Sequence, residues 1–547
     1  MSLSKDASNK LDYRLVRRKR GDAVDGFQHY FNLSKSLGRL QTRFDAYLMK
    51  NDQVALSSEW NRFKFDVAYG SKWFIPGYRY QQDRNAVRSQ FDDRVVSTAM
   101  NFSEHTFYLK NADTLKTTYG IDYQLREDRL PINGMLLDNN QSETWNAFFR
   151  RNFDDNNRLS LLFTYRNLEN LNESGIDRND ETIMGRVDWV GSFFDRIVRS
   201  ELNYNLSNSR ELRREFIFIQ VPTGQGTHTW RDDNGDGIQD LNEFYLAINP
   251  DEKNYAKIFV PTDTFEEAFN TIISYRFNLN FPRAWNNEAG IKKVISHFSN
   301  TTAWSLNSKI TDDDLGSRLL PTNVPDSLVL GLNESVRSTL FFNRSNTKFG
   351  ADIGIAQIQN KQLLLNGFER RANRDIRTHF RWNLNRSLNL DVNYIDGNRS
   401  NASDELVPRN YQIEQTTFQP SLSWQPFRTI RITGKLSQKD KRNVLFEGAG
   451  ETATLRELEL SMRYAKAAKT TLSSGFRFIN IDFQGTENTP TGYELLEALR
   501  PGQNLTWNIN WQQKLGKGLQ LVLRYDGRKS ADSRAVHLGR VQVSALF

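Results

Sequence analysis

The stretch "NLTWNINW" (504–511) alternates strictly between polar and apolar side chains. The alternating residues are Leu505, Trp507, Ile509 and Trp511 on one side, and Asn504, Thr506, Asn508 and Asn510 on the other. Successive side chains of a β-strand point to opposite faces of the sheet. A period of two therefore predicts a strand with one apolar and one polar face.

The same period recurs on both sides of this stretch. Examples are "LQLVLRYD" (519–526), "IRITGKLS" (430–437), "LNLDVNY" (388–394), "ELNYNLS" (201–207) and "LSLLFTYR" (159–166). We count roughly 20 to 25 such segments, commonly about 9–14 residues long, whereas strands of soluble proteins average about 5–6 residues. Segments of about 9–11 residues are what a tilted strand needs to cross a bilayer.

Three segments depart from the simple pattern. "GFRFINIDF" (475–483) changes phase between Phe478 and Ile479, which predicts a bulge or a strand that passes from one environment into another. "GYELLEALRPG" (492–502) predicts a helical turn or two in a connection, and "DTFEEAFNTII" (263–273) fits either a helix or a strand.

Composition excludes several classes of protein. Hydrophobic residues make up 38% and aromatic residues 12% of the 547 residues, and the formal net charge is +8. The absence of cysteine excludes disulfides and thiolate sites. No apolar run is long enough for a transmembrane helix. The first residues lack the apolar core of a signal peptide, so the chain acts in the cytosol or its leader lies outside this sequence.

The class of β protein follows from the two strand faces. A soluble sandwich, propeller or solenoid also alternates, but we find no fixed-length repeat. Aromatic residues gather near strand ends, as at Trp424 and Phe427, and the polar faces carry Arg, Asn and Gln. We therefore predict that residues 1–547 form a single transmembrane antiparallel β-barrel of about 20–26 strands, with apolar residues facing lipid. Closure is required because lipid satisfies no backbone group.

The C-terminal stretch "RVQVSALF" (540–547) extends the alternation to the last residue. It resembles the signal that the barrel-assembly machinery of Gram-negative bacteria reads in outer-membrane proteins, carried here by Val541, Val543, Ala545 and Phe547. The segments 492–547 and "TWRDDNGDGIQDLNEFYLA" (229–247) resemble parts of large, mostly uncharacterised outer-membrane proteins of Bacteroidota.

The resemblance implies an outer-membrane location, with outer-membrane lipid, lipopolysaccharide and the barrel-assembly machinery as partners. Those relatives are often longer. We therefore expect this chain to be the C-terminal part of a larger protein, with its leader outside this sequence.

"DDNGDGIQDLNE" (232–243) fits the calcium-loop pattern D-x-[DN]-x-[DN]-G-x5-E. The predicted Ca²⁺ ligands are Asp232, Asn234, Asp236, Ile238 through its carbonyl, Asp240 and Glu243. A solvated acidic turn that binds nothing is the alternative. The flanking sequences predict strands rather than the two helices of an EF-hand, so we do not expect a calcium switch. We expect instead a structural ion that orders an extracellular loop insert at about 222–264.

Nothing in the remaining sequence indicates catalysis. The six histidines stand singly, and no G-x-S-x-G or phosphate-binding loop is present. Basic residues are spread along the chain, which argues against nucleic acid.

We expect a channel, or the barrel subunit of a transport, secretion or surface-assembly complex, with a surface lipoprotein or periplasmic protein as a candidate partner. No plug domain precedes the strands, so the chain does not look like a complete TonB-dependent receptor. A structural barrel that presents surface loops and a barrel-embedded lipid or peptide hydrolase remain alternatives.

Overall fold

The computed structural model describes residues 2–6, 9–21, 24–71, 73–112, 116–171, 180–312, 314–322, 324–364, 367–403, 409–445, 450–467, 469–516 and 518–545. Its strands are β1 (Ser2–Asp6), β2 (Asn9–Arg20), β3 (Val24–Leu37), β4 (Leu40–Gln53), β5 (Leu56–Tyr69), β6 (Ile75–Ser89), β7 (Met100–Lys110), β8 (Thr117–Ile132), β9 (Met135–Asp154), β10 (Asn157–Asn170), β11 (Asp180–Phe193), β12 (Val198–Gln220), β13 (His228–Trp230), β14 (Phe244–Leu246), β15 (Tyr255–Asn280), β16 (Phe298–Ile310), β17 (Val329–Phe342), β18 (Phe349–Leu364), β19 (Gly367–Asn383), β20 (Leu388–Ser403), β21 (Tyr411–Phe427), β22 (Ile430–Asn443), β23 (Thr452–Lys466), β24 (Thr470–Gln484), β25 (Gly502–Gly516), β26 (Leu519–Ser530) and β27 (Val536–Ala545). The helices are η1 (Leu241–Glu243), η2 (Pro250–Glu252), η3 (Arg283–Asn287), α1 (Ile291–Ser296), α2 (Leu315–Leu319), η4 (Asp326–Leu328) and α3 (Pro490–Leu495).

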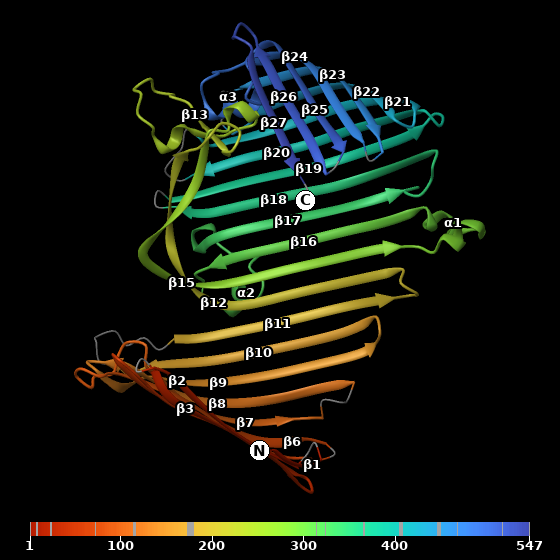
Figure 1. The fold of residues 1–547 in the computed structure, drawn as a ribbon. Helices are drawn as coiled ribbons and strands as arrows, with labels where there is room; N and C mark the ends of the chain where they lie inside the picture. Colours follow the sequence, from red (N-terminus) through yellow and green to blue (C-terminus); the bar gives the residue numbers. More distant parts are fainter. Residues whose placement is uncertain are drawn as a thin grey trace. The chain divides into compact units, whose positions relative to one another are not determined.

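The chain divides into two compact units, residues 1–191 with 201–208, and residues 192–200 with 209–547. In the first unit, β1 to β11 pair in chain order as antiparallel neighbours. In the second unit, β15 to β27 do the same (Figure 1). Of the 27 strands in the described residues, the three-residue β13 and β14 form a side hairpin, which leaves 25. The predicted all-β antiparallel class and strand number are confirmed.

Strand register in the second unit sorts apolar and polar side chains onto opposite faces. A cross-strand row runs through Leu390, Leu422, Gly434, Leu460, Phe476 and Trp507, from β20 to β25. The next positions along each strand belong to the other face, which carries Lys435 on β22, Glu459 on β23 and Arg477 on β24. The alternation read from the sequence is therefore carried in register across the sheet.

The apolar face is exposed. The cross-strand row from Leu390 to Trp507 and the neighbouring rows on the same face form what we call the apolar band. It extends from Phe418 to Trp424 on β21 and from Leu458 to Met462 on β23. Side chains of the band are about half exposed, with 54% for Leu460 and 47% for Phe476. Soluble monomers rarely expose apolar patches larger than a few hundred Å². The band therefore requires a further apolar partner.

Trp507 of β25 lies over the backbone of Gly527, its register partner on β26. A Cβ atom on Gly527 would overlap the indole ring. The same arrangement occurs in the first unit, where Tyr108 covers Gly77 and Phe148 covers Gly120. Each glycine is thus required by the close approach of a ring from the next strand.

The phase change in "GFRFINIDF" is not a bulge, because β23 and β24 pair without a register shift from Thr452 to Lys466. Phe476 lies in the exposed band, whereas Ile479 and Ile481 are 0% and 2% exposed on the opposite face. There they join an apolar cluster with Leu455. The other predicted explanation, a strand that passes from one environment into another, is confirmed. "DTFEEAFNTII" is strand throughout, within β15.

Connections in the second unit differ in length between the two ends of the sheet. Consecutive antiparallel strands connect at alternate ends. One end carries the short turns 384–387 and 428–429, and the other carries the long segments 221–254 and 485–501. We call these the short-turn end and the long-connection end. The segment 281–297, with η3 and α1, is a long exception at the short-turn end. Among the described residues, no helix is long and apolar enough to span a bilayer.

Candidate functional site

Residues 485–501, between β24 and β25, fold back onto the polar face as a cap that contains α3. The helix starts at an N-cap, where Thr489 Oγ1 accepts a hydrogen bond from the Gly492 amide at 3.0 Å. A side chain at 492 would overlap the carbonyl of Thr486. "GYELLEALRPG" was predicted to hold a helical turn or two, and α3 confirms it, beginning two residues earlier.

The cap is held by an apolar core. Leu495, Leu496 and Leu499 of the cap are 0%, 2% and 7% exposed. They pack with Tyr411, Ile413, Ala453, Leu455, Ile479 and Ile481 of β21, β23 and β24. This is why the strand alternation changes near Ile479: the polar face becomes apolar where the cap covers it.

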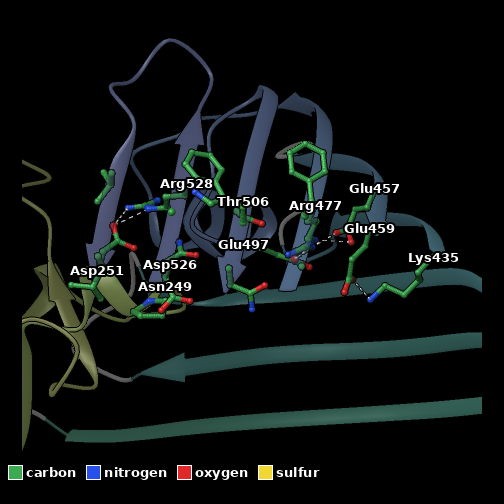
Figure 2. A pocket seen from close by; sticks show the side chains of 18 of the residues that line it. Asn249, Asp251, Lys435, Glu457, Glu459, Arg477, Glu497, Thr506, Asp526 and Arg528 are labelled. Atoms are coloured by element: carbon green, nitrogen blue, oxygen red, sulfur yellow. Dashed lines mark hydrogen bonds and ion pairs between the residues drawn. The ribbon is translucent and has the colours of Figure 1, made fainter. Parts of the chain in front are cut away.

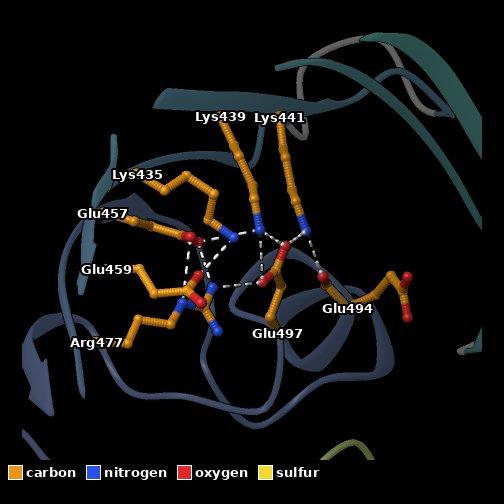
Figure 3. A network of polar contacts seen from close by, with 8 residues as sticks. All are labelled: Lys435, Lys439, Lys441, Glu457, Glu459, Arg477, Glu494 and Glu497. Atoms are coloured by element: carbon orange, nitrogen blue, oxygen red, sulfur yellow. Dashed lines mark hydrogen bonds and ion pairs between the residues drawn. The ribbon is translucent and has the colours of Figure 1, made fainter. Parts of the chain in front are cut away.

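Next to this core, a charged network joins the cap to the strands (Figure 3). The Glu497 carboxylate accepts hydrogen bonds from Lys439 Nζ at 2.9 and 3.0 Å, and lies 3.1 Å from Lys441 Nζ. Arg477 pairs with Glu457 at 2.5 Å and reaches Glu497 at 3.7 Å. Since the side chain of Lys441 is 5% exposed and that of Glu457 is 2% exposed, these charges are stabilised chiefly by one another.

The network keeps the Glu497 carboxyl group of the cap ionised. Burial alone would raise the pKa of Glu497, but Lys441 and Lys439 outweigh it and lower the pKa to about 2 from the usual 4.5. A depressed pKa in the docked state stabilises docking at pH values above 4.5 and loses that stabilisation as the pH falls through about 2.

We therefore expect the cap to stay docked at neutral pH and to loosen as the pH falls from about 4.5 toward 2. Hydrogen-exchange protection of the cap amides 493–499 across this range, with Glu497→Gln beside the native chain, measures the effect. Protection in the native chain should fall progressively toward low pH, and the variant should be weakly protected at all pH values. Native protection that is flat over this range would contradict the assignment.

A cleft of about 490 Å³ lies beside the network (Figure 2). Its walls come from strands β21 to β27, from Glu497 of the cap and from residues 249–251. Ion pairs line it, including Lys435 with Glu459 at 2.5 Å, and uncharged polar groups such as Thr506 lie between them. This surface can bind or pass hydrophilic solutes through hydrogen bonds and balanced charge. Among the described residues, its lining contains no serine, cysteine or histidine.

Residues 221–254, which we call the insert, form the second wall. Arg528 of β26 binds both Asp251 and Glu252 of the insert, at 2.8 and 3.0 Å. The insert also contacts the cap: the rings of Tyr245 and Tyr493 are 5.2 Å apart, and the Arg231 guanidinium lies 5.2 Å from the Tyr493 ring. Insert and cap therefore support each other above the cleft.

The predicted calcium loop connects the two strands of the β13–β14 hairpin within the insert. Both Asp232 carboxylate oxygens accept loop amides, from Gly235 at 2.7 Å and from Gly237 at 3.0 Å. Asn234 and Asp236 each accept the amide two residues further on. Strands rather than helices flank the loop, and η1 is its one helical turn. The sequence predicted the insert to about 264, but it ends at 254 because β15 begins at Tyr255.

The other predicted ligands divide between solvent and core. Ile238 and Asp240 are exposed. Glu243 is 1% exposed, and its carboxylate accepts hydrogen bonds from Trp230 Nε1 at 2.9 Å and from the Asp233 amide at 3.2 Å. The donor chemistry, oxygen only, suits Ca²⁺. Within the described residues, no three Asp, Glu, His or Cys side chains are gathered as metal ligands.

The predicted C-terminal signal lies on β27. Val541 and Val543 are 66% and 61% exposed, and they share a face with Leu523 and Leu521 of β26. Ala545 is exposed on the same face, and Phe547 lies outside the described residues. The described part of the signal thus extends the apolar face of the sheet.

No family model matches the chain, and no curated protein sequence matches it. Among solved structures, the chain is similar to the closed form of the ferric-catecholate import receptor Fiu of E. coli, at 9% identity over 93% of this chain and 78% of that one, with a TM-score of 0.31. It is similar to the FrpB iron transporter of Neisseria meningitidis at 9% identity, over 90% of this chain and 77% of that one, with a TM-score of 0.32. It is similar to the siderophore receptor PirA of Acinetobacter baumannii at 9% identity, over 94% of this chain and 75% of that one, with a TM-score of 0.32. Similarities at this level carry no inference about this chain.

Proposed function

We propose that this chain is a β-barrel of a bacterial outer membrane that provides a gated passage for hydrophilic solutes, alone or as the barrel subunit of a transport, secretion or surface-assembly complex. The observation that carries the proposal is the exposed apolar band, backed by a charged and polar opposite face. Lipid would cover the band, and water or cargo would meet the polar face. Closure of the sheet follows from the cost of leaving a backbone edge in lipid.

The height of the band supports this membrane position. On β21, the apolar-face positions are large and apolar from Phe418 to Phe427, a length that suits one tilted crossing of about 9–11 residues. Aromatic side chains gather toward the short-turn end, where the rings of Phe298 and Phe342 are 5.2 Å apart and Trp382 is the register partner of Phe349. Such rings mark the interface between lipid and water.

The orientation follows from the connections. Outer-membrane barrels have short periplasmic turns and longer extracellular loops. By this rule the short-turn end faces the periplasm, and the insert and the cap lie at the cell surface. The cap and the insert then form a gate on the lumen wall, because both cover the charged cleft.

Conductance in planar lipid bilayers tests the passage. Purified chain should insert and give low or intermittent conductance when the gate is docked, and steady conductance when the Glu497 network is broken. Stable insertion without conductance in either form would overturn the passage. It would favour the second candidate, a barrel that presents its folded insert and cap to partners, because these segments form an ordered surface.

We also propose that the insert binds one structural Ca²⁺, with Asp232, Asn234, Asp236, Asp240, Glu243 and the Ile238 carbonyl as ligands. Extracellular loops of this kind bind at about 10⁻⁴–10⁻³ M. Support comes from the full motif match and from the side chains already turned onto the loop amides.

Calcium at about ten times its dissociation constant should stabilise the insert by about 1.4 kcal/mol. Hydrogen exchange of amides 231–245 should therefore slow roughly tenfold on going from chelator to Ca²⁺, with little effect of Mg²⁺. The Asp236→Ala variant should show no calcium effect. Equal protection by the two metals, or full calcium protection in the variant, would contradict the site.

The proposed location defines the partners. Outer-membrane lipid and lipopolysaccharide would cover the band, and the barrel-assembly machinery would read Val541, Val543 and Ala545, with Phe547 as the terminal residue. A surface lipoprotein would meet the insert and cap, whereas a periplasmic partner would meet the short-turn end.

A further inference from the structure

A second groove, of about 670 Å³, lies across strands β19 to β23. Its lining includes Asp396, Thr416 and Asp440, which are consecutive register partners from β20 to β22. These positions belong to the same face as the apolar band, because Asp396 lies two residues beyond Tyr394 and Thr416 lies two before Phe418. The groove is therefore on the outer wall, next to the band on its long-connection side.

The groove is a polar surface with an aromatic edge. Tyr394 and Phe418 are register partners at the top of the band and are 47% and 53% exposed. Beyond them, Asp396 is exposed, and Asp440 accepts a hydrogen bond from Thr454 Oγ1 at 2.8 Å. Aromatic faces beside carboxylates and hydroxyls suit sugar rings, which have both apolar faces and hydroxyl groups.

Two exposed arginines add a second chemistry. Arg442 pairs with Glu414 at 3.6 Å, and this pair is weak because both side chains are more than half exposed. The side chain of Arg374, also exposed, makes no hydrogen bond or ion pair within the described part of the chain, and neither does the side chain of Asp396. Exposed guanidinium groups bind phosphate in a bidentate manner. The groove therefore offers sites for hydroxyl groups and for phosphate within one concave surface.

We propose that this groove binds the phosphorylated sugar headgroup of lipopolysaccharide in the outer leaflet. The inference rests on the proposed membrane function, which places the apolar band in lipid and the long-connection end outside the cell. The headgroup of an outer-leaflet lipid whose acyl chains cover the band would then reach the groove. The sugars would lie against Tyr394 and Phe418 and bond Asp396 and Asp440, and Arg374 and Arg442 would hold the phosphates.

Binding to purified protein in detergent tests the proposal. Four probes separate its parts: lipopolysaccharide with lipid A and inner-core sugars, lipid A alone, soluble core oligosaccharide, and phosphatidylglycerol. Native chain should bind the first most tightly. The Arg374→Ala, Asp396→Ala double variant should lose at least tenfold in affinity for it, and Tyr394→Ala should weaken it severalfold. Arg524→Ala, which removes an exposed arginine from the opposite face of β26, is the matched control and should bind like the native chain.

Equal affinity of the double variant and the native chain for the full glycolipid would overturn the proposal. So would equal affinity of the native chain for phosphatidylglycerol, because the acyl chains alone would then explain retention. Tight binding of soluble core oligosaccharide without lipid would also overturn it, in favour of a free saccharide ligand. Failure of the native chain to insert into bilayers would instead reject the proposed membrane function, so the two failures are distinguishable.

Discussion

Replacing Glu497 by alanine should release the cap. The variant removes the carboxylate that lies between Lys439 and Lys441 and leaves the nearly buried Lys441 ammonium without a countercharge. Loss of one partner from a buried ion pair costs about 3–5 kcal/mol. Hydrogen exchange of cap amides 493–499 should therefore accelerate by about two to four orders of magnitude, with strand amides of β23 unchanged.

Glu487→Ala is the matched control, since Glu487 is an exposed carboxylate of the same cap segment. It should leave cap exchange within about twofold of the native rate, because exposed surface substitutions are usually within about 0.5 kcal/mol of neutral. If both variants exchange alike, the network does not hold the cap. If Glu497→Ala opens the cap without raising conductance, the cap is docked by the network but does not gate a passage.

A single arginine in the apolar band should separate a membrane protein from a soluble one. Leu460 lies in the middle of the band on β23, half exposed, between Gly434 and Phe476 of the neighbouring strands. On the lipid face of a barrel, arginine near the bilayer midplane costs about 2–4 kcal/mol. On the surface of a soluble protein the same change would be close to neutral.

Leu460→Arg should therefore lower the folded fraction in lipid vesicles under urea, with a lower midpoint than the native chain. Ser461→Arg is the matched control, because it places the same charge one residue further along on the polar face. It should change the midpoint little. A destabilisation by Ser461→Arg as large as that by Leu460→Arg would argue that the two faces do not differ in environment.

The sequence predicted the strands well because their signal is local and repeated. Period-two alternation identified β25 from "NLTWNINW" and showed which of its side chains share a face, as the register with β24 confirms. In the same way, the even spacing of Lys435, Lys439 and Lys441 along β22 places three lysines on one face.

The charged site itself was beyond sequence reasoning. Glu497 lies 58 residues from Lys439, two residues beyond the short helix α3. That helix exists because the cap is buried, not because its local pattern is strong. For the same reason the phase change at Ile479 had two explanations until the apolar cluster under the cap distinguished them. The calcium motif located Glu243 but gave no sign of its bond to Trp230.

The tryptophan that lies over Gly527 has a consequence for assembly. A slip of one residue between β25 and β26 would turn every side chain of one strand to the wrong face, so the apolar pattern already forbids it. A slip of two residues preserves both faces, and that pattern cannot detect it. It would, however, set the indole of Trp507 against Tyr525 or Lys529 instead of bare backbone. Packing of the Trp507 ring on Gly527 thus disfavours the two-residue register shift, which the apolar pattern alone would allow.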